Sequence, residues 1–395
     1  MLLVMVATQA VAENEFEAYR AKQQANTEFD DYKKTVNQEF SDYKTALEAG
    51  FNDFQKTYEQ ASKQYNQEMT QKWGSSKSSD KKSWVNYEKN GDVRESVDFS
   101  TGIVVVEVLA NKGDSLATIQ AKAQENISKL LLTTEKQAFN NDVVAQKVEE
   151  QIKQHKEVVK TGEPSTTTKV MQGLVGNISE PEATQQAANF VSKAKVETTE
   201  LKDKEKKVVK LTFKIPDNLS AKAAQYSQRI QQIAKKEKIP VALMYAVMET
   251  ESNFNPRAKS HVPAYGLMQI VPVSAGKDAT KYLFGKEKVL APSYLYNSDK
   301  NIEIGGAYLH ILYHRYLRKI DDTTSRLFCT IAAYNTGAGN VAKTFIGTYN
   351  INKAAKTINT FSASDVYKTL RRQLPHDETR QYIKRVATRL AKYQS

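Results

Sequence analysis

The sequence contains few of the residues that crosslink or interrupt a chain. Its 395 residues include one cysteine, nine prolines, sixteen glycines and two tryptophans. A single cysteine, Cys329, allows no disulfide within the chain, and its apolar neighbours favour a small core residue. A disulfide-stapled fold is therefore excluded. The chain is long enough for two or three domains, each of which can bury a core of its own.

Acidic residues are fewer than basic ones. The chain has 45 Asp and Glu against 57 Lys and Arg, a formal net charge of +12 and a pI near 9.3. A charged fraction of 26% and a mean hydropathy of −0.58 are typical of a soluble protein. The excess of positive charge favours an anionic partner, which could be nucleic acid, anionic lipid or an acidic cell-wall polymer. Charge alone does not choose among them.

The first twelve residues, MLLVMVATQAVA, carry no charge and are too short to span a bilayer. They end in Ala10-Val11-Ala12, which resembles the cleavage site of a secretory signal, although the usual basic start is missing. The alternative is an apolar start to the next helix. No cysteine follows to accept a lipid. The segment predicts export to the periplasm or cell envelope of a Gram-negative-type bacterium, in a soluble or peripherally attached form.

Residues 13–72 contain no proline and one glycine, and their aromatic residues recur regularly. Eleven residues make three helical turns, so this spacing keeps one stripe along a long helix. A coiled-coil-like arm is predicted, whose stripe packs on another chain, folds back on itself or docks on the globular part. The alternative is a disordered, charged spacer. Two sets of aromatic residues are spaced by eleven: Phe29, Phe40 and Phe51, and Tyr32, Tyr43, Phe54 and Tyr65.

Residues 72–82 are rich in Gly, Ser and Lys, which indicates a linker. Beyond it, β-branched and alternating patterns predict a small α+β domain over residues 83–217. No catalytic cluster occurs within it. Its predicted elements are strands at 103–109 and 209–215, helices at 116–132 and 143–159, and a loop at 161–168.

From residue 221 onward, apolar residues recur at helical spacing between short breaks at Gly and Pro, which predicts an all-α domain over residues 221–395. One of its helices begins after Pro240, a residue tolerated in the first turn. The predicted apolar face of that helix carries Leu243, Val247, Thr250, Glu251 and Phe254.

Glu251 is the candidate for acid–base chemistry. A carboxyl on an apolar face resists ionisation, so its pKa should rise, as a general acid requires. The alternative is a structural carboxyl bonded to backbone amides, and periodicity does not decide between them. Glu249 lies about 200° round the helix and points elsewhere. It cannot complete the carboxyl pair of an ordinary glycosidase, roughly 5 to 9.5 Å apart. One carboxyl would then act as acid and afterwards as base.

Four short motifs resemble, in order and spacing, the lytic transglycosylase domain of the soluble-lytic-transglycosylase type, whose fold is similar to goose-type lysozyme. The resemblance covers residues of about 221 to 395. Residues 83–217, with Trp84 shortly before a strand pair, more faintly resemble the N-terminal domain of membrane-bound lytic murein transglycosylase C, which is a lipoprotein. The motifs are Glu251-Ser252-x-Phe254-x-Pro256, Gly266-Leu267-Met268-Gln269-Ile270 with Pro272, Ala333-Tyr334-Asn335-x-Gly337-x-Gly339, and Glu378-Thr379-Arg380-x-Tyr382.

The resemblance implies an α+β multidomain enzyme that cleaves the β-1,4 bond between N-acetylmuramic acid and N-acetylglucosamine in peptidoglycan. It implies that Glu251 protonates the leaving oxygen and then deprotonates the C6 hydroxyl, which closes a 1,6-anhydro ring. No cofactor or metal is implied. The expected partners are glycan strands, and the arm could mediate self-association or contact wall or membrane proteins. The residues expected to contact the sugar or to hold the acid are Ser252, Met268, Gln269, Tyr334, Asn335 and Tyr382.

Three rival functions remain open. A muramidase on the same fold would use water and leave reducing ends. A non-catalytic wall-binding scaffold would depend on the aromatic arm and tolerate the loss of Glu251. A basic nucleic-acid-binding protein would be cytoplasmic, and Ala10-Val11-Ala12 argues against it. His310 and His314 are four residues apart on a helix but lack the Glu and the third ligand of a zinc site.

Overall fold

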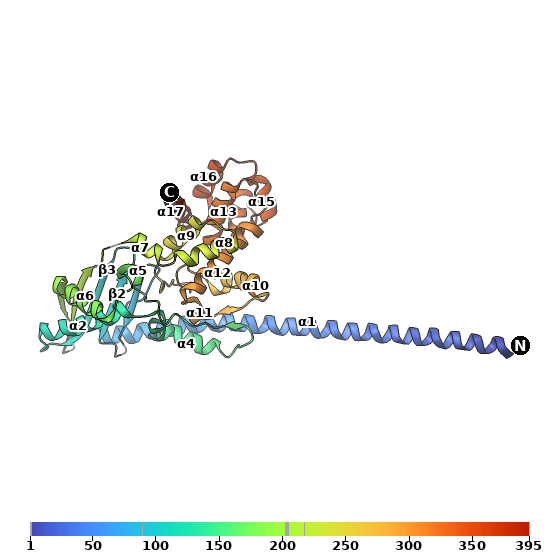
Figure 1. Ribbon diagram of the computed structural model, residues 1–395, viewed down its shortest axis with the longest axis horizontal. Helices are drawn as coiled ribbons and strands as arrows, with labels where there is room; N and C mark the ends of the chain where they lie inside the picture. Colours follow the sequence, from blue (N-terminus) through green and yellow to red (C-terminus); the bar gives the residue numbers. More distant parts are fainter. Residues whose placement is uncertain (1, 89, 202–204, 217, 395) are drawn as a thin grey trace.

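The computed structural model shows a long helix lying against a two-part body of strands and helices (Figure 1). It describes residues 2–88, 90–201, 205–216 and 218–394, and within residues 2–28 only the side chains of Lys22 and Gln24. The predicted signal segment, residues 1–12, therefore lies outside the described side chains. Within the described residues, no helix combines the length and apolar character needed to cross a bilayer.

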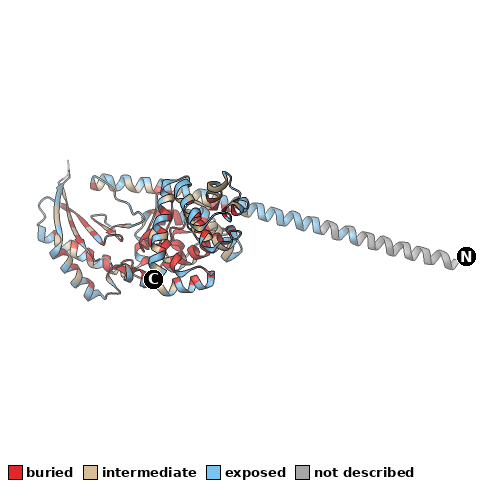
Figure 2. Ribbon diagram, turned by 90° about the horizontal axis from the view of Figure 1, so that it is seen from above, coloured by how far each residue is buried: buried red, intermediate tan, exposed pale blue. Residues whose placement is uncertain are grey.

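The long helix, α1 (Leu2–Trp73), contains all of residues 13–72. Its C-terminal part runs beneath the body beside α4, whereas its N-terminal part projects beyond it (Figures 1 and 2). Phe54 and Tyr58 are buried in the docked part, but Phe29, Tyr32 and Phe40 are 58%, 66% and 70% exposed. The aromatic stripe thus docks on the chain's own body over only part of its length.

A five-stranded antiparallel sheet, in the order β1-β2-β3-β6-β5, follows α1 in the chain. The strands predicted at 103–109 and 209–215 correspond to β3 and β6, which pair in the middle of the sheet. The other three strands were not predicted, because charged and polar residues interrupt their alternation. The strands are β1 (Ser83–Tyr87), β2 (Val93–Asp98), β3 (Ile103–Asn111), β5 (Lys195–Glu200) and β6 (Lys206–Lys214).

Two helices bury their apolar sides together with the sheet, in a core separate from that of the helical body. Helix α2 (Leu116–Leu132) has the predicted bounds and begins at Ser115, whose side chain accepts a hydrogen bond from the Thr118 amide. Helix α6 (Glu180–Lys193) was not predicted, although Ser179 and Glu182 form a capping box at its start.

The helix predicted over residues 143–159 is too long. Helix α4 (Val143–Ile152) follows the short α3 (Glu135–Asn140) and ends at a turn, where the amides of Val158 and Val159 bond to the His155 carbonyl. Val159 then enters β4 (Val159–Lys160), which pairs in parallel with β7 (Val289–Leu290). Val158 and Val159, which extended the predicted helix, therefore bond to or pair with Val289, which is distant in sequence.

Except for the short α5, which buries Leu174 in the core of the sheet, the remaining helices form the helical body, with α9 buried on almost all sides. Its core extends beyond these helices and takes in Phe54 and Tyr58 of α1 and Val148 of α4. The elements are α5 (Gln172–Val175), α7 (Leu219–Ala224), α8 (Ser227–Glu237), α9 (Val241–Ser252), π-helix η1 (Pro272–Gly276), α10 (Lys277–Phe284), α11 (Pro292–Leu295), α12 (Ser298–His310), π-helix η2 (Ile311–Tyr316), α13 (Thr323–Thr336), α14 (Ala338–Ile346), α15 (Ile351–Ile358), α16 (Ala363–Gln373) and α17 (Asp377–Gln394).

Candidate active site

Glu251 lies in the last turn of α9 and is 5% exposed. The helix ends at Ser252, and the next residue, Asn253, adopts the left-handed conformation with φ 53°. Phe254, with φ 64°, therefore lies beyond the helix, and its predicted place on the helical face of Glu251 was wrong. The reversal immediately after Glu251 carries the chain away from the carboxyl and leaves it at a helix terminus.

Burial raises the pKa of the Glu251 carboxyl. The positive charge of Lys81 and the adjacent hydroxyl of Tyr382 partly oppose this effect, and the negative charge of Glu378 adds to it. The net direction is upward, as the sequence predicted from the apolar face. A carboxyl in this state can hold a proton above the pH range in which ordinary glutamates lose theirs.

Glu249 points into different surroundings. Its carboxylate lies 2.9 Å from the Arg389 side chain and accepts a 2.7 Å hydrogen bond from the Tyr393 hydroxyl. Both partners belong to α17, so Glu249 fastens α9 to the C-terminal helix. The helical phase had separated the two glutamates correctly, and Glu249 has the partners of a structural carboxylate.

The segment Gly266–Ile270 forms a tight loop beside the end of α9. Gly266 has φ 71°, and a Cβ there would lie 2.8 Å from the Leu295 carbonyl oxygen, so only glycine fits without movement. Gln269 also adopts a left-handed conformation, with φ 47°. Its Nε2 donates to the Gly266 carbonyl, whereas its buried Oε1 accepts no hydrogen bond from the described residues. Such backbone conformations are costly in non-glycine residues and concentrate at functional sites.

Ser252 and Met268 are both fully buried. The Ser252 hydroxyl bonds to the Leu267 carbonyl at 2.7 Å and so ties the loop to α9. The Met268 amide donates to Asn301 at 2.8 Å, and the Met268 carbonyl accepts from the Tyr334 hydroxyl at 2.8 Å. Neither side chain is accessible to a ligand in this conformation. Their visible role is to hold the loop in place.

Tyr334, Asn335 and Tyr382 come from α13 and α17. Burial, and then the nearby charge of Glu251, keep the pKa of both tyrosines well above the usual range. Asn335 accepts a 2.7 Å hydrogen bond from Thr379, which joins α13 to α17. The two tyrosines thus lie close to Glu251, and Asn335 belongs to the contact between α13 and α17.

Sequence reasoning missed Lys81, which belongs to the connector, defined here as residues 74–82 between α1 and β1. Its Nζ lies 3.6 Å from Oε2 of Glu251 and 3.6 Å from Oε1 of Glu378. The two carboxyl oxygens are therefore no further apart than twice that distance. Sequence reasoning weighed only Glu249 as a second carboxylate, whereas folding brings α17 against α9 and with it Glu378. The signal for Glu378 was present in the fourth motif, whereas Lys81 carried none.

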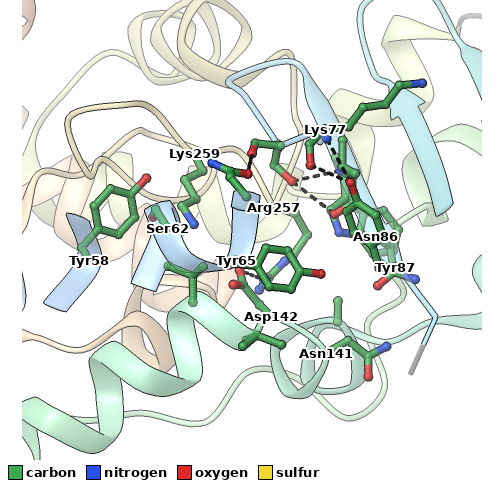
Figure 3. Close-up of a pocket in the computed structure, with 18 of the residues that line it drawn as sticks. Tyr58, Ser62, Tyr65, Lys77, Asn86, Tyr87, Asn141, Asp142, Arg257 and Lys259 are labelled. Atoms are coloured by element: carbon green, nitrogen blue, oxygen red, sulfur yellow. Dashed lines mark hydrogen bonds and ion pairs between the residues drawn. The ribbon is translucent and has the colours of Figure 1, made fainter. Parts of the chain in front are cut away.

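A cavity of about 330 Å³ lies apart from the predicted site residues, none of which lines it. Figure 3 shows Tyr58 and Tyr65 of α1 on one side of it, with Asp142, Arg257 and Lys259 nearby. The Arg257 guanidinium lies 2.9 Å from the Asp142 carboxylate and stacks over the ring of Tyr296. This ion pair anchors the chain after Glu251 to the start of α4.

His310 and His314 take part in packing. His310 Nδ1 lies 2.9 Å from the Glu237 carbonyl oxygen, and His314 Nε2 lies 3.0 Å from that of Lys238. The His310 ring also stacks on Tyr282. Across the part of the chain that the structure describes, no group of three or more His, Cys, Asp or Glu residues is placed to hold a metal ion.

Two family models match consecutive parts of the chain. Residues 228–357, which include Glu251, match the transglycosylase SLT domain. Residues 51–226 match the N-terminal domain of membrane-bound lytic murein transglycosylase C. Both models describe lytic transglycosylases, and the two matches follow one another along the chain. The second match begins inside α1 and so includes docked residues of that helix, such as Phe54 and Tyr58, as well as the sheet.

Curated relatives bear the name membrane-bound lytic murein transglycosylase C. The protein from Klebsiella pneumoniae (strain 342) is 41% identical over 179 residues, 45% of this chain and 49% of that protein. The one from Yersinia pestis (strain Pestoides F) is 41% identical over 172 residues, 44% and 47% respectively. The chain thus spans about half the length of the curated relatives it matches.

A solved structure, a complex of the 70-kDa soluble lytic transglycosylase with bulgecin A, is 26% identical. The match covers 45% of this chain and 25% of that one. The TM-score is 0.35, too low for this likeness to bear on fold or function.

Proposed function

We propose that this protein is a peptidoglycan lytic transglycosylase of the cell envelope, with a lysozyme-like catalytic domain that cleaves the bond between N-acetylmuramic acid and N-acetylglucosamine. The observation that carries the proposal is the buried carboxyl of Glu251, with its raised pKa, inside the segment that matches the transglycosylase SLT domain. Glu249 is engaged by Arg389 and Tyr393 and does not compete for this role.

In the proposed reaction, protonated Glu251 gives its proton to the glycosidic oxygen as the C1–O bond breaks. The 2-acetamido oxygen of the muramic acid bonds to C1 and stabilises the developing positive charge. The C6 hydroxyl oxygen of the same sugar then attacks C1 and displaces the acetamido oxygen. Glu251, now a carboxylate, takes the C6 hydroxyl proton. The products are an anhydro end and a free N-acetylglucosamine hydroxyl, and no water is consumed.

Glu378 supports a second candidate, hydrolysis. Two carboxyls up to about 9.5 Å apart can act as acid and as a base that activates water, and the shared contact with Lys81 keeps Glu251 and Glu378 within that range. The Glu378 side chain is, however, 68% exposed, whereas that of Glu251 is 6% exposed. We therefore favour ring closure by Glu251 alone.

Mass spectrometry of digested peptidoglycan separates the two reactions, because anhydro products are lighter than hydrolysis products by one water. We expect 1,6-anhydromuramic acid ends from the natural sequence and from Glu378→Gln. Reducing ends, together with loss of turnover in Glu378→Gln, would establish the hydrolase instead. Peptidoglycan that binds to the protein but stays uncut would indicate a wall-binding scaffold.

We further propose that the exposed part of α1 pairs with the same part of a second copy. The exposed Phe29, Tyr32 and Phe40 continue the stripe that is buried further along the helix at Phe54. Because eleven residues fill three turns, two copies of this stripe stay in phase along their contact. A second copy carries the same eleven-residue spacing, so its stripe matches this one along the whole contact.

Analytical ultracentrifugation tests this pairing with two matched serine variants. Phe40→Ser removes a stripe residue and should weaken dimer formation at least tenfold. Gln38→Ser, an exposed position on the opposite side of the helix, should leave it unchanged. If the protein with the natural sequence remains monomeric at tens of micromolar concentration, self-association is refuted. Wall or membrane proteins then remain as the partners of the arm.

A further inference from the structure

We infer that Lys81 is a positioning residue for the proton transfers at Glu251, supplied from outside the segment that matches the transglycosylase SLT domain. Lys81 precedes the first strand of the sheet, whereas Glu251 ends a helix of the helical body. Their contact at 3.6 Å joins the two parts of the chain at the candidate active site. The inference rests on the proposed role of Glu251 as acid and base.

The connector holds Lys81 in place through bonds on either side of it. The Asp80 carboxylate accepts hydrogen bonds from the backbone amides of Lys82 and Ser83, both at 2.7 Å. The Asp80 carbonyl accepts from the Lys259 amide at 3.2 Å, which ties the connector to the chain that follows α9. A Gly/Ser/Lys-rich segment that the sequence indicated as a linker is thus fastened to both parts of the protein.

Lys77 anchors the earlier half of the connector. Its ammonium group lies 2.7 Å from the buried carboxylate of Glu107 on β3, which is also bound by Arg94 on β2. Its backbone amide donates to the Tyr87 hydroxyl at 2.9 Å. Because the connector is attached to the sheet as well as to the helical body, the position of Lys81 depends on how the two parts dock.

The charged and titratable groups around Glu251 come from three places. The connector supplies Lys81, α17 supplies Glu378 and Tyr382, and α13 supplies Tyr334. The positive charge of Arg385, also on α17, opposes the rise in the pKa of Tyr382. Among the described residues, Lys81 is the one cation within ion-pair distance of Glu251, and with the Tyr382 hydroxyl it stabilises the ionised form.

Lys81 acts differently on the two halves of the proposed reaction. While Glu251 holds its proton, Lys81 opposes the effect of burial and makes the carboxyl a stronger acid. Once the proton has left, Lys81 stabilises the carboxylate until it removes the C6 proton. Glu378 competes for the same ammonium group, so its charge weakens the hold of Lys81 on Glu251. Because a stabilised carboxylate is also a weaker base, Lys81 favours the donation of the proton and opposes the later removal of the C6 proton.

The test is the pH profile of kcat/KM on soluble glycan strands. Its alkaline limb reports loss of the proton from Glu251 in the free enzyme. Lys81→Met removes the cation and should move this limb upward by about one pH unit. Lys81→Arg keeps the charge and should restore the original limb. Lys82→Met, at the exposed neighbouring position, should not move it.

Glu378→Gln should shift the alkaline limb in the opposite direction. It removes the competing anion, so Glu251 should lose its proton more readily and the limb should move downward. The same substitution in Lys81→Met protein should also move the limb downward, but by less, because no ammonium group is left to be released. A limb that stays in place in Lys81→Met, with activity reduced evenly at every pH, would show a merely structural Lys81 and overturn the inference.

A second readout separates this inference from the proposed reaction. The Glu251 carboxyl carbon can be titrated by ¹³C NMR in the substrate-free protein and assigned by its absence from Glu251→Gln. Lys81→Met should raise the observed pKa whatever the reaction products are. If Lys81→Met raises the pKa of Glu251 but digested peptidoglycan carries reducing ends, ring closure is refuted and the role of Lys81 is supported. An unchanged pKa would refute that role.

Discussion

At the residue scale, the two glutamates of α9 show that surroundings decide the role of a carboxyl. Both are less than a tenth exposed. Glu249 lies against Arg389 and accepts a hydrogen bond from Tyr393, contacts that fasten α9 to α17. Glu251 faces tyrosines and a lysine shared with Glu378, and burial dominates its pKa. Glu251 is therefore suited to hold a proton and then release it.

Matched amide variants test this difference. Glu251→Gln should lower turnover at least about 100-fold, because it removes the proton donor, while glycan binding is retained. Glu249→Gln should leave turnover within about twofold but lower the unfolding free energy by about 1–3 kcal/mol, because the Arg389 charge loses its partner. Turnover is measured by product release and stability by urea unfolding. Equal turnover in the two variants would remove Glu251 from the mechanism.

At the element scale, α1 is one helix with two environments. The eleven-residue spacing is the same in both parts, since it follows from helix geometry. Phe54 is nevertheless buried and meets the ring of Tyr265 edge-on at 6.0 Å, whereas Phe40 is exposed. The repeat therefore identifies which side of the helix is apolar. What covers that side depends on where the helical body lies.

Alanine substitutions at these two positions should differ in cost. Phe54→Ala leaves a void in the shared core and should lower the unfolding free energy by about 3–5 kcal/mol. Phe40→Ala should change that of the monomer by less than about 0.5 kcal/mol. Urea unfolding at dilute protein concentration measures both. A small cost at Phe54 would mean that the docked part of α1 does not contribute to the core.

At the scale of the whole molecule, buried polar contacts hold the sheet-bearing part and the helical body together. Glu135 of α3 accepts hydrogen bonds from the backbone amide and the hydroxyl of Ser298 at the start of α12. Burial raises the pKa of Glu135 to about 7. Lys81 bridges the same two parts at the candidate active site. The relative position of the parts therefore bears on both stability and the proposed chemistry.

The raised pKa of Glu135 predicts a pH-dependent stability. Between about pH 4.5 and 7 the unfolded chain releases this proton and the folded chain keeps it, so stability falls as pH rises through that window. Below the window both states are protonated, and above it both are ionised. Glu135→Gln should remove a decline on the order of 3 kcal/mol. Urea unfolding at pH 5 and pH 8 measures it, and an unchanged slope in the variant would refute this cause.

Features that depend on local spacing were predictable. The helix at 116–132, the central strands β3 and β6, and the opposite directions of Glu249 and Glu251 follow from a cap, an alternation and a helical phase. Features that depend on distant partners were not. Helix α4 ends early because Val159 pairs with Val289, far along the chain.

The sequence by itself determined the motifs, the long helix with its stripe and the candidate acid, because these depend on residue type and on spacing within one element. Only the tertiary structure decided which part of the stripe is covered, that Ser252 and Met268 are buried, and that Glu378 approaches Glu251. It alone brought Lys81 to the carboxyl, because that contact joins residues 170 positions apart in sequence. Contacts of this kind are set by how separate elements pack, and no local pattern records them.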